Sequence, residues 1–225
     1  GAERAIVRTQ FVSGTHALAT VLFGILRPDD RLVSITGTPY DTMQTVIGWA
    51  HESCGSLREF GVSYDELPMH EGRVDLDGIA RIVTPETKVA LVQRSRGYSE
   101  RQPLSIADIR AVSARIKAAN PNCIVFVDNC YGEFVETEEP TAIADVDIMA
   151  GSLIKNPGGG LAPTGGYIAG RSDLVEMASY RLTAPGMGDE LGASLISNRL
   201  IFQGLFLAPH VVAQALKGAA FAAGI

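Results

Sequence analysis

The stretch Ala150-Gly-Ser-Leu-Ile-Lys-Asn-Pro-Gly-Gly-Gly160 places a lysine at the end of an apolar run. The run from Val146 to Ile154 has Asp147 as its only charged residue, so it predicts a buried strand. The proline and glycines that follow cannot continue a strand. Lys155 is therefore expected at a junction between a strand and a turn.

The position of Lys155 allows two interpretations. A lysine in a packed place is expected to be partly desolvated, which lowers the pKa of its amine and makes it a nucleophile toward carbonyl groups, as in Schiff-base chemistry. Alternatively, the side chain only extends from the strand end to the surface. The residue alone does not separate the two, but two other stretches favour the chemical role.

These stretches supply an acid and an anion site. Cys123-Ile-Val-Phe-Val-Asp128-Asn129 is an apolar run that ends in a carboxylate, as a parallel strand buried on both faces does at its functional end. Asp128 is therefore well placed to bind a cation. Ser13-Gly14-Thr15-His16 opens a run of helix length, residues 17–26. Its hydroxyls, its glycine and the free N–H groups of the first helical turn predict a phosphate site.

The three features together fit one cofactor, pyridoxal phosphate. Its aldehyde would bond to Lys155, and its ring nitrogen would stay protonated against Asp128. Asn129 would hydrogen-bond near the ring. The phosphate would rest on the turn formed by Ser13, Gly14 and Thr15.

Five segments carry a resemblance to known enzymes. The chain resembles the large domain of a fold-type I pyridoxal-phosphate enzyme, and it is most similar to the methionine gamma-lyase/aluminium-resistance family, relatives of the cystathionine lyases. The order of the segments along the chain is more specific than any one of them. They are Val12-Ser-Gly-Thr-His-Ala17, Thr36-Gly-Thr-Pro-Tyr-Asp41, Gln93-Arg-Ser-Arg-Gly-Tyr98, Val127-Asp-Asn-Cys-Tyr-Gly-Glu-Phe134 and Gly151-Ser-Leu-Ile-Lys-Asn-Pro-Gly-Gly-Gly160.

The resemblance implies roles for two further residues. In the related lyases a tyrosine in the context of Tyr40 stacks on the pyridine ring and assists the leaving group, so Tyr40 is a candidate for both roles. From its residues alone, a tyrosine packed at a helix start is as good an interpretation. A serine in the position of Ser152 contacts the phosphate in related enzymes, and the alternative is a hydroxyl satisfied by the backbone.

The resemblance also implies a domain organisation. Residues 1–225 are expected to form the cofactor-binding large domain as a fragment, without the N-terminal segment and without the small C-terminal domain that carries the arginine for the substrate carboxylate. Complete relatives build the site between subunits. A homo-oligomer, at least a dimer, is therefore expected for the intact protein.

Composition limits the partners. With 46% hydrophobic and 20% charged residues, the chain can bury a full core and belongs to the globular class. The formal net charge of −6 argues against nucleic acid and favours small molecules as partners. Three cysteines without metal-type spacing favour reduced thiols in a cytoplasm, and no metal site is expected. No apolar run is expected to span a membrane.

Helical and extended patterns alternate along the chain, which predicts an α/β fold: a mostly parallel sheet with helices on both faces. Asp41 is expected to cap a helix that runs to Ala50, and Ser105 or Asp108 to cap another. Other strands are expected at 31–36, 62–67 and 88–93, and helices at 74–83 and 104–119. Residues 164–170 would form the one antiparallel strand, next to the lysine strand.

Arg94 and Arg96 lie where strand 88–93 ends, with Tyr98 close by. They can bind a carboxylate or a phosphate, or they can form a solvated basic turn that pairs with Glu100. Both interpretations stay open. The segment 131–139 that follows Asp128 is expected to be an acidic surface loop.

The functional hypothesis is a carbon–sulfur lyase that acts on a sulfur-containing amino acid. Lys155 would remove the Cα proton, and a thiolate would then leave from Cβ or Cγ. Within the same fold, amino-group transfer or aldol cleavage is the alternative. A non-catalytic module with this fold is a second alternative.

Overall fold

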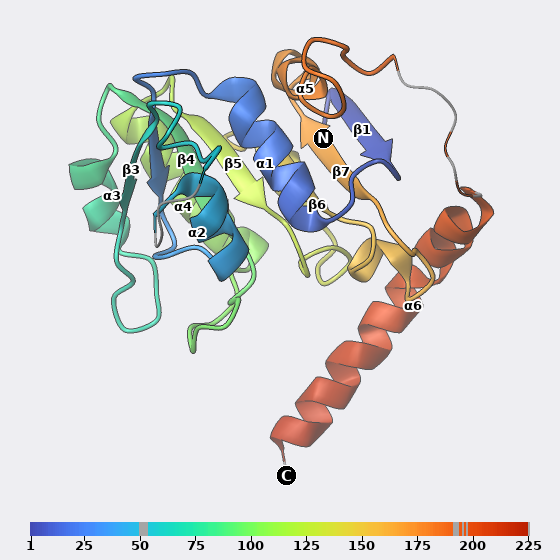
Figure 1. Ribbon diagram of the computed structural model, residues 1–225. Helices are drawn as coiled ribbons and strands as arrows, with labels where there is room; N and C mark the ends of the chain where they lie inside the picture. Colours follow the sequence, from blue (N-terminus) through green and yellow to red (C-terminus); the bar gives the residue numbers. More distant parts are fainter. Residues whose placement is uncertain (50–53, 191–193, 195, 197, 225) are drawn as a thin grey trace.

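The computed structural model describes residues 1–49, 54–190, 194, 196 and 198–224. Its centre is a sheet of seven strands in the order β1-β7-β6-β5-β4-β2-β3 (Figure 1). The fold class is the one the sequence predicts. In chain order the strands are β1 Arg4–Arg8, β2 Arg31–Ser34, β3 Ser63–Glu66, β4 Thr87–Gln93, β5 Ile124–Asp128, β6 Ile148–Ser152 and β7 Gly166–Gly170.

One strand runs against the others. Strands β3, β2, β4, β5 and β6 are parallel to their neighbours, whereas β7 pairs antiparallel with both β6 and β1. The predicted antiparallel strand beside the lysine strand is thereby confirmed. Strand β1 (Arg4–Arg8) is not predicted from the sequence; it forms the edge of the sheet, and only its central Ile6 is buried.

Two layers of helices cover the sheet. Helices α1 (Gly14–Ile25), α2 (Asp41–Ile47) and α5 (Ser172–Ser179) pack on one face, and α3 (Leu76–Ile82) and α4 (Ile106–Ala119) on the other. A sixth helix, α6 (Asn198–Ala223), projects from the body (Figure 1).

Polar residues begin these helices. The Ser13 hydroxyl accepts a hydrogen bond from the His16 N–H at 3.1 Å and caps α1. At α4, Ser105 is the cap and forms a reciprocal capping box with Asp108. The expected cap at Asp41 is wrong, because Asp41 is already the first helical residue and Tyr40 occupies the cap position. The expectation that this helix runs to Ala50 is also wrong, because α2 ends at Ile47, where Gly48 takes the left-handed cap conformation (φ +81°).

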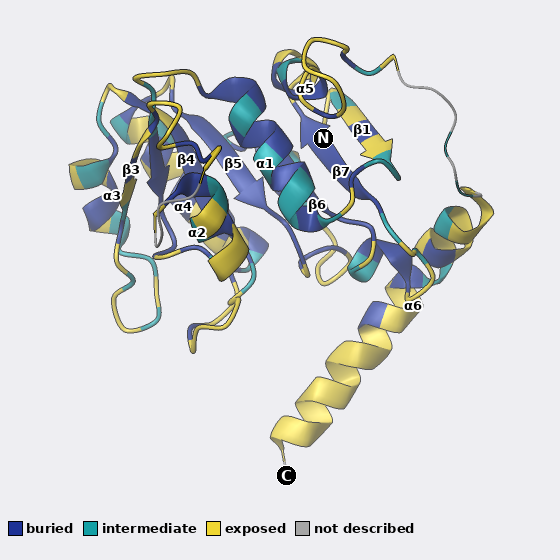
Figure 2. Ribbon diagram, in the orientation of Figure 1, coloured by how far each residue is buried: buried dark blue, intermediate teal, exposed yellow. Residues whose placement is uncertain are grey.

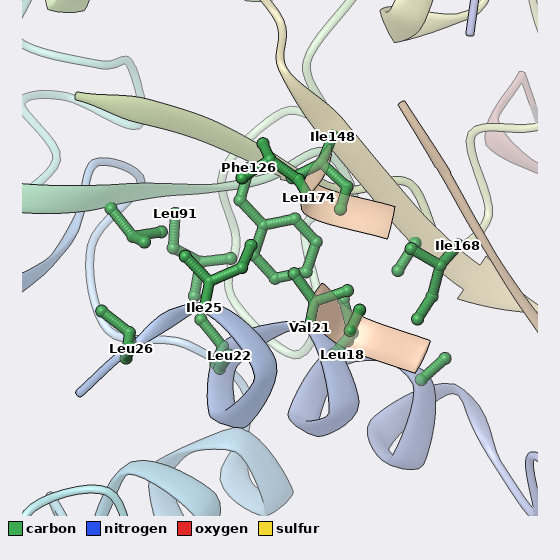
Figure 3. Packing of buried hydrophobic residues seen from close by; sticks show 14 of the residues in the cluster. Leu18, Val21, Leu22, Ile25, Leu26, Leu91, Phe126, Ile148, Ile168 and Leu174 are labelled. Atoms are coloured by element: carbon green, nitrogen blue, oxygen red, sulfur yellow. The ribbon is translucent and has the colours of Figure 1, made fainter. Parts of the chain in front are cut away.

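The core under α1 shows why the strands have this register. Leu18, Val21, Leu22 and Ile25 of α1 point at the sheet, where Phe126 fills the space between them (Figure 3). All five side chains are essentially inaccessible to solvent. Burying a side chain of this size contributes about 1.5–3 kcal/mol, so a shift of β5 by one residue, which would turn Phe126 to the other face, is strongly disfavoured.

Helix α6 contacts the body through a narrow stripe. Its buried residues are Gly204, Ala208 and Val212, spaced four apart, while most of the helix is exposed (Figure 2). With 26 residues, α6 is long and apolar enough to cross a membrane by length and composition alone. This corrects the expectation that no such run exists. Core helices of soluble proteins meet the same criterion.

The stripe touches the loop that follows Lys155. A Cβ atom added at Gly204 would lie 2.1 Å from the backbone oxygen of Gly158. We therefore expect Gly204→Ala to displace α6 from this loop and to cost about 1–3 kcal/mol of unfolding free energy in the full-length protein. Chemical denaturation measures the change.

Helix α6 also supplies the matched control. A Cβ at Gly218 would meet no atom within 4 Å, so Gly218→Ala is expected to be neutral or to stabilise the protein by up to about 1 kcal/mol. Equal effects of the two substitutions would contradict the described contact between α6 and the 158–159 loop.

Candidate active site

The alternation of side chains along β5 and β6 brings two polar residues to the α1 face. Phe126 points toward α1, so Asp128, two residues later at the strand end, has the same parity. In β6, Ile148 and Ala150 pack in the cluster under α1, and Ser152 follows the same parity. A Cβ on Gly14 would come within 3.1 Å of the Ser152 Cβ. The first turn of α1 therefore meets the carboxyl end of β6.

Asp128 is a buried acid at the expected strand end. Its carboxylate accepts a hydrogen bond from the backbone N–H of Cys130 at 3.1 Å. Burial raises the pKa of Asp128, because the charged form loses its hydration. The hydrogen bonds from Cys130 and the nearby charges of Lys155 and Arg101 act in the opposite direction. A cation placed beside this carboxylate would stabilise its charged form.

Lys155 lies just beyond the end of β6, as predicted, and is half-buried. Its amine stands 4.3 Å from the centre of the Tyr131 ring, a cation–π contact. Burial alone would lower the pKa of Lys155, but Cys130, Asp128 and Tyr131 outweigh it and raise the pKa. The expected lowering of the pKa is therefore wrong for the free amine, because the sequence did not reveal these neighbours.

The structure thus brings the two central residues together. Lys155 and Asp128 interact electrostatically with each other, and each also interacts with Cys130. Cys130 is buried, and its Sγ would lie 3.2 Å from a Cβ at Gly14. Amine, carboxylate and helix N-terminus share one region at the carboxyl edge of the sheet.

The hydroxyls of the predicted anion turn already have partners. The Ser13 hydroxyl caps α1, while the Thr15 hydroxyl bonds to the Tyr40 hydroxyl at 3.2 Å and to the Thr42 hydroxyl at 2.9 Å. Ser152 accepts a hydrogen bond from the Ile154 N–H at 3.3 Å. A hydroxyl group that makes one hydrogen bond can still make others. Both interpretations of Ser152, contact with the phosphate and a hydrogen bond to the backbone, are therefore compatible with its position.

Tyr40 is held from two sides. Its hydroxyl contacts Thr15, and its backbone N–H donates to the Gln93 side chain at 3.2 Å. Burial raises the pKa of the Tyr40 phenol, and the nearby Asp128 raises it further. Tyr40 is therefore a neutral phenol at physiological pH, near both the anion turn and the buried acid.

Asn129 belongs to a network behind the site. Its amide oxygen accepts from Arg94 at 2.7 Å, and its amide nitrogen donates to the Tyr167 hydroxyl at 3.1 Å and to Glu139 at 2.9 Å. Every hydrogen bond described for this amide goes to these three residues. Its contact with a cofactor ring stays a prediction.

The two arginines of the loop that follows β4 differ in burial. Arg94 is buried and paired with Glu136 at 2.8 Å, so the solvated turn paired with Glu100 is wrong for it, while a contact with a ligand stays a prediction. Arg96 is exposed. The expected acidic surface loop is confirmed for residues 134–138, which are exposed, but not for Glu133, which is buried and accepts a hydrogen bond from the Tyr167 hydroxyl at 2.6 Å.

Sequence reasoning missed two residues beside the site. Tyr131 has a φ of +67°, a conformation uncommon for a side-chain-bearing residue, and it places its ring under Lys155. Arg101 is a buried cation that donates to the backbone oxygen of Gln93 at 2.7 Å. Neither the left-handed backbone of Tyr131 nor the burial of Arg101 leaves a signal in the sequence. The one available signal was that Tyr131 lies only three residues after Asp128.

These features define a class of protein: an α/β domain with a lysine, a buried acid and a helix N-terminus at one sheet edge. The chain belongs to the methionine gamma-lyase family, whose sequence model matches residues 1–225.

Three known proteins show how close the similarity is. The uncharacterized protein YnbB of Bacillus subtilis is 52% identical over 225 residues, which are 99% of this chain and 53% of that protein. The structure of a proposed cystathionine beta-lyase involved in aluminium resistance from Listeria monocytogenes is 56% identical, with a TM-score of 0.94 over 98% of this chain and 54% of that one. This chain therefore spans about half the length of these relatives.

A more distant structure shares the fold alone. The pyridoxal-5'-phosphate-dependent protein YhfS from Escherichia coli is 18% identical, with a TM-score of 0.67 over 94% of this chain and 51% of that one.

Proposed function

We propose that the full-length protein that contains this chain is a pyridoxal-phosphate-dependent carbon–sulfur lyase. Its substrate would be a sulfur-containing amino acid, cleaved by β- or γ-elimination. The observation that carries the proposal is that Lys155, the buried Asp128 and the first turn of α1 lie together at one sheet edge, close enough for the two charges to interact. Membership of the methionine gamma-lyase family and the similarity to a proposed cystathionine beta-lyase support it.

The donor set fits the cofactor. A buried carboxylate with a raised pKa would be stabilised by a protonated ring nitrogen, and Asp128 is such a group. The backbone of Gly14 packs closely on Ser152 and Cys130. A side chain at position 14 would press against both residues and crowd the first turn of α1. That turn, with Ser13, Gly14 and Thr15, would hold the phosphate together with Ser152.

Each residue would then have a defined task. Lys155 would bind the aldehyde and, once released by the substrate, accept the Cα proton at its Nζ. Asp128 would keep the ring nitrogen protonated. The bound cofactor supplies an electron sink for the carbanion that forms at Cα. Tyr40, a neutral phenol, would lie against the ring and donate its proton to the departing sulfur.

The proposal includes a cytoplasmic homo-oligomer. All three cysteines are free, as the reduced thiols of a cytoplasm are: Cys54 is exposed, and Cys123 and Cys130 are buried. Helix α6 leaves large apolar side chains exposed, and these favour a covering partner: Leu200, Phe202, Leu205, Phe206, Val211, Leu216 and Phe221.

The test is a product assay on the purified full-length protein with added cofactor. Cystathionine, cysteine and methionine are offered separately, and thiol and 2-oxo acid are measured together. We expect both products in equal amounts from at least one substrate. Transfer of the amino group to an added 2-oxo acid without thiol release would favour an aminotransferase, and cleavage of a 3-hydroxy amino acid would favour an aldolase.

A further inference from the structure

Arg96 is the cation of the strand-end loop that the fold leaves available. Arg94 and Arg101 of the same segment are buried, Arg94 against Glu136 and Arg101 against backbone oxygens. The Arg96 side chain is exposed and has no hydrogen bond or ion pair with any residue that the structure describes. We propose that Arg96 binds the carboxylate of the substrate's leaving group, so that the preferred substrates are amino acids such as cystathionine, whose departing thiol is itself acidic.

The loop is built to hold Arg96 in place. The carbonyl of Ser95 accepts a hydrogen bond from the Gln93 side chain at 3.1 Å, and Arg101 binds the same carbonyl. The carbonyl of Arg96 accepts from the Ser99 hydroxyl at 2.6 Å. Bonds on both sides fix the backbone at Arg96, so the loop loses less backbone freedom when Arg96 binds a ligand.

Arg96 lines two cavities, each of which it shares with one aromatic residue of the candidate site. A cavity of about 450 Å³ is lined by Arg96, Tyr131, Leu104, Val135 and Leu216 among others. A second cavity, of about 240 Å³, is lined by Arg96 together with Tyr40 and Gln93. Tyr131, whose ring contacts the Lys155 amine, also lines the larger cavity, so we expect a substrate held at Lys155 to extend into it.

Charge favours an acidic occupant. The larger cavity is lined by Arg94, Arg96 and Glu136, and the smaller by Arg96, Arg101 and Asp41, so each has one excess positive charge. The chain as a whole has a formal net charge of −6. A cationic region on an acidic protein attracts anions selectively.

Size separates two kinds of leaving group. A cavity of about 450 Å³ falls within the usual range for organic ligands, and a methyl thiol would leave most of it unfilled and Arg96 unpaired. A leaving group of the size of homocysteine would fill more of it and would offer a carboxylate. A guanidinium binds such a carboxylate through two parallel hydrogen bonds.

The inference rests on the proposed lyase function, and kinetics test it in the full-length protein with its cofactor. We expect Arg96→Gln to lower kcat/KM for cystathionine by about 30- to 100-fold, mostly through KM, and for methionine by less than about threefold. Arg96→Lys should recover part of the loss. The control Arg115→Gln removes the same charge on α4, and both substrates should then react as in the wild type.

A binding measurement needs no turnover. In the Lys155→Ala background, calorimetry should show that the additional Arg96→Gln change weakens cystathionine binding and leaves methionine binding unaltered. Equal losses for the two amino acids would place Arg96 on their shared α-carboxylate and would overturn the assignment. So would unchanged cystathionine binding. A wild type that releases no thiol while Arg96 still governs binding would refute the lyase function alone.

Discussion

Lys155→Ala is expected to abolish thiol release by the full-length protein, with a fall in kcat/KM of at least about a thousandfold. The amine of Lys155 is the group that would bind the aldehyde and take the Cα proton, and the variant removes both functions at once. The visible absorbance of the bound cofactor should be lost together with the activity. Absorbance spectra and the product assay on one preparation measure the two losses.

Two further variants test whether Lys155 acts through its covalent bond or only through its charge. Lys88 is an exposed lysine at the opposite end of the parallel strands, near the start of β4, so Lys88→Ala should retain spectrum and activity. Lys155→Arg keeps a cation over the Tyr131 ring but cannot form the covalent bond, and it should be as inactive as the alanine variant. An active arginine variant would show that the lysine acts only through its charge.

Glu133→Gln is expected to change the pH dependence of stability. Burial raises the pKa of Glu133 to about 7, and its Oε2 atom is buried without a hydrogen-bond partner among the described residues. The unfolded chain ionises this carboxyl near pH 4.5, whereas the folded protein holds the proton until about pH 7. Between these values unfolding releases a proton, so rising pH destabilises the wild type.

The expected size follows from the two pKa values. Wild-type stability should fall by about 3 kcal/mol relative to Glu133→Gln as the pH rises from below 4.5 to above 7, with the full deficit above pH 7. Urea denaturation at a series of pH values gives both curves. Glu138→Gln, an exposed glutamate in the same segment, is the control. Parallel curves for the wild type and Glu133→Gln would contradict a protonated Glu133 in the fold.

The sequence predicted the parts of the fold that hydrophobic runs and polar caps determine. Strands β5 and β6 are continuous apolar runs, and each ends where a carboxylate or a turn makes further burial costly. Ser105 and Asp108 cap α4 as expected because both capping bonds are local. Strand β1 was missed, because a short edge strand with one buried side chain has almost no hydrophobic signal.

In the candidate site, too, the sequence predicted some features and could not predict others. The sequence located Lys155 and Asp128, because strand ends in a parallel sheet meet at one edge. It could not give the pKa of Lys155, which depends on Cys130 and Tyr131, or the burial of Arg94 by Glu136. These are contacts between residues 24 to 42 positions apart. Only the folded chain creates them.

Covalent trapping shows directly whether Lys155 carries the cofactor. The full-length protein is incubated with pyridoxal phosphate, reduced with borohydride and digested, and its peptides are weighed by mass spectrometry. We expect the added mass of one reduced cofactor on the peptide that contains Lys155, and none after Lys155→Ala. Cofactor mass on another lysine, or on no lysine, would contradict it.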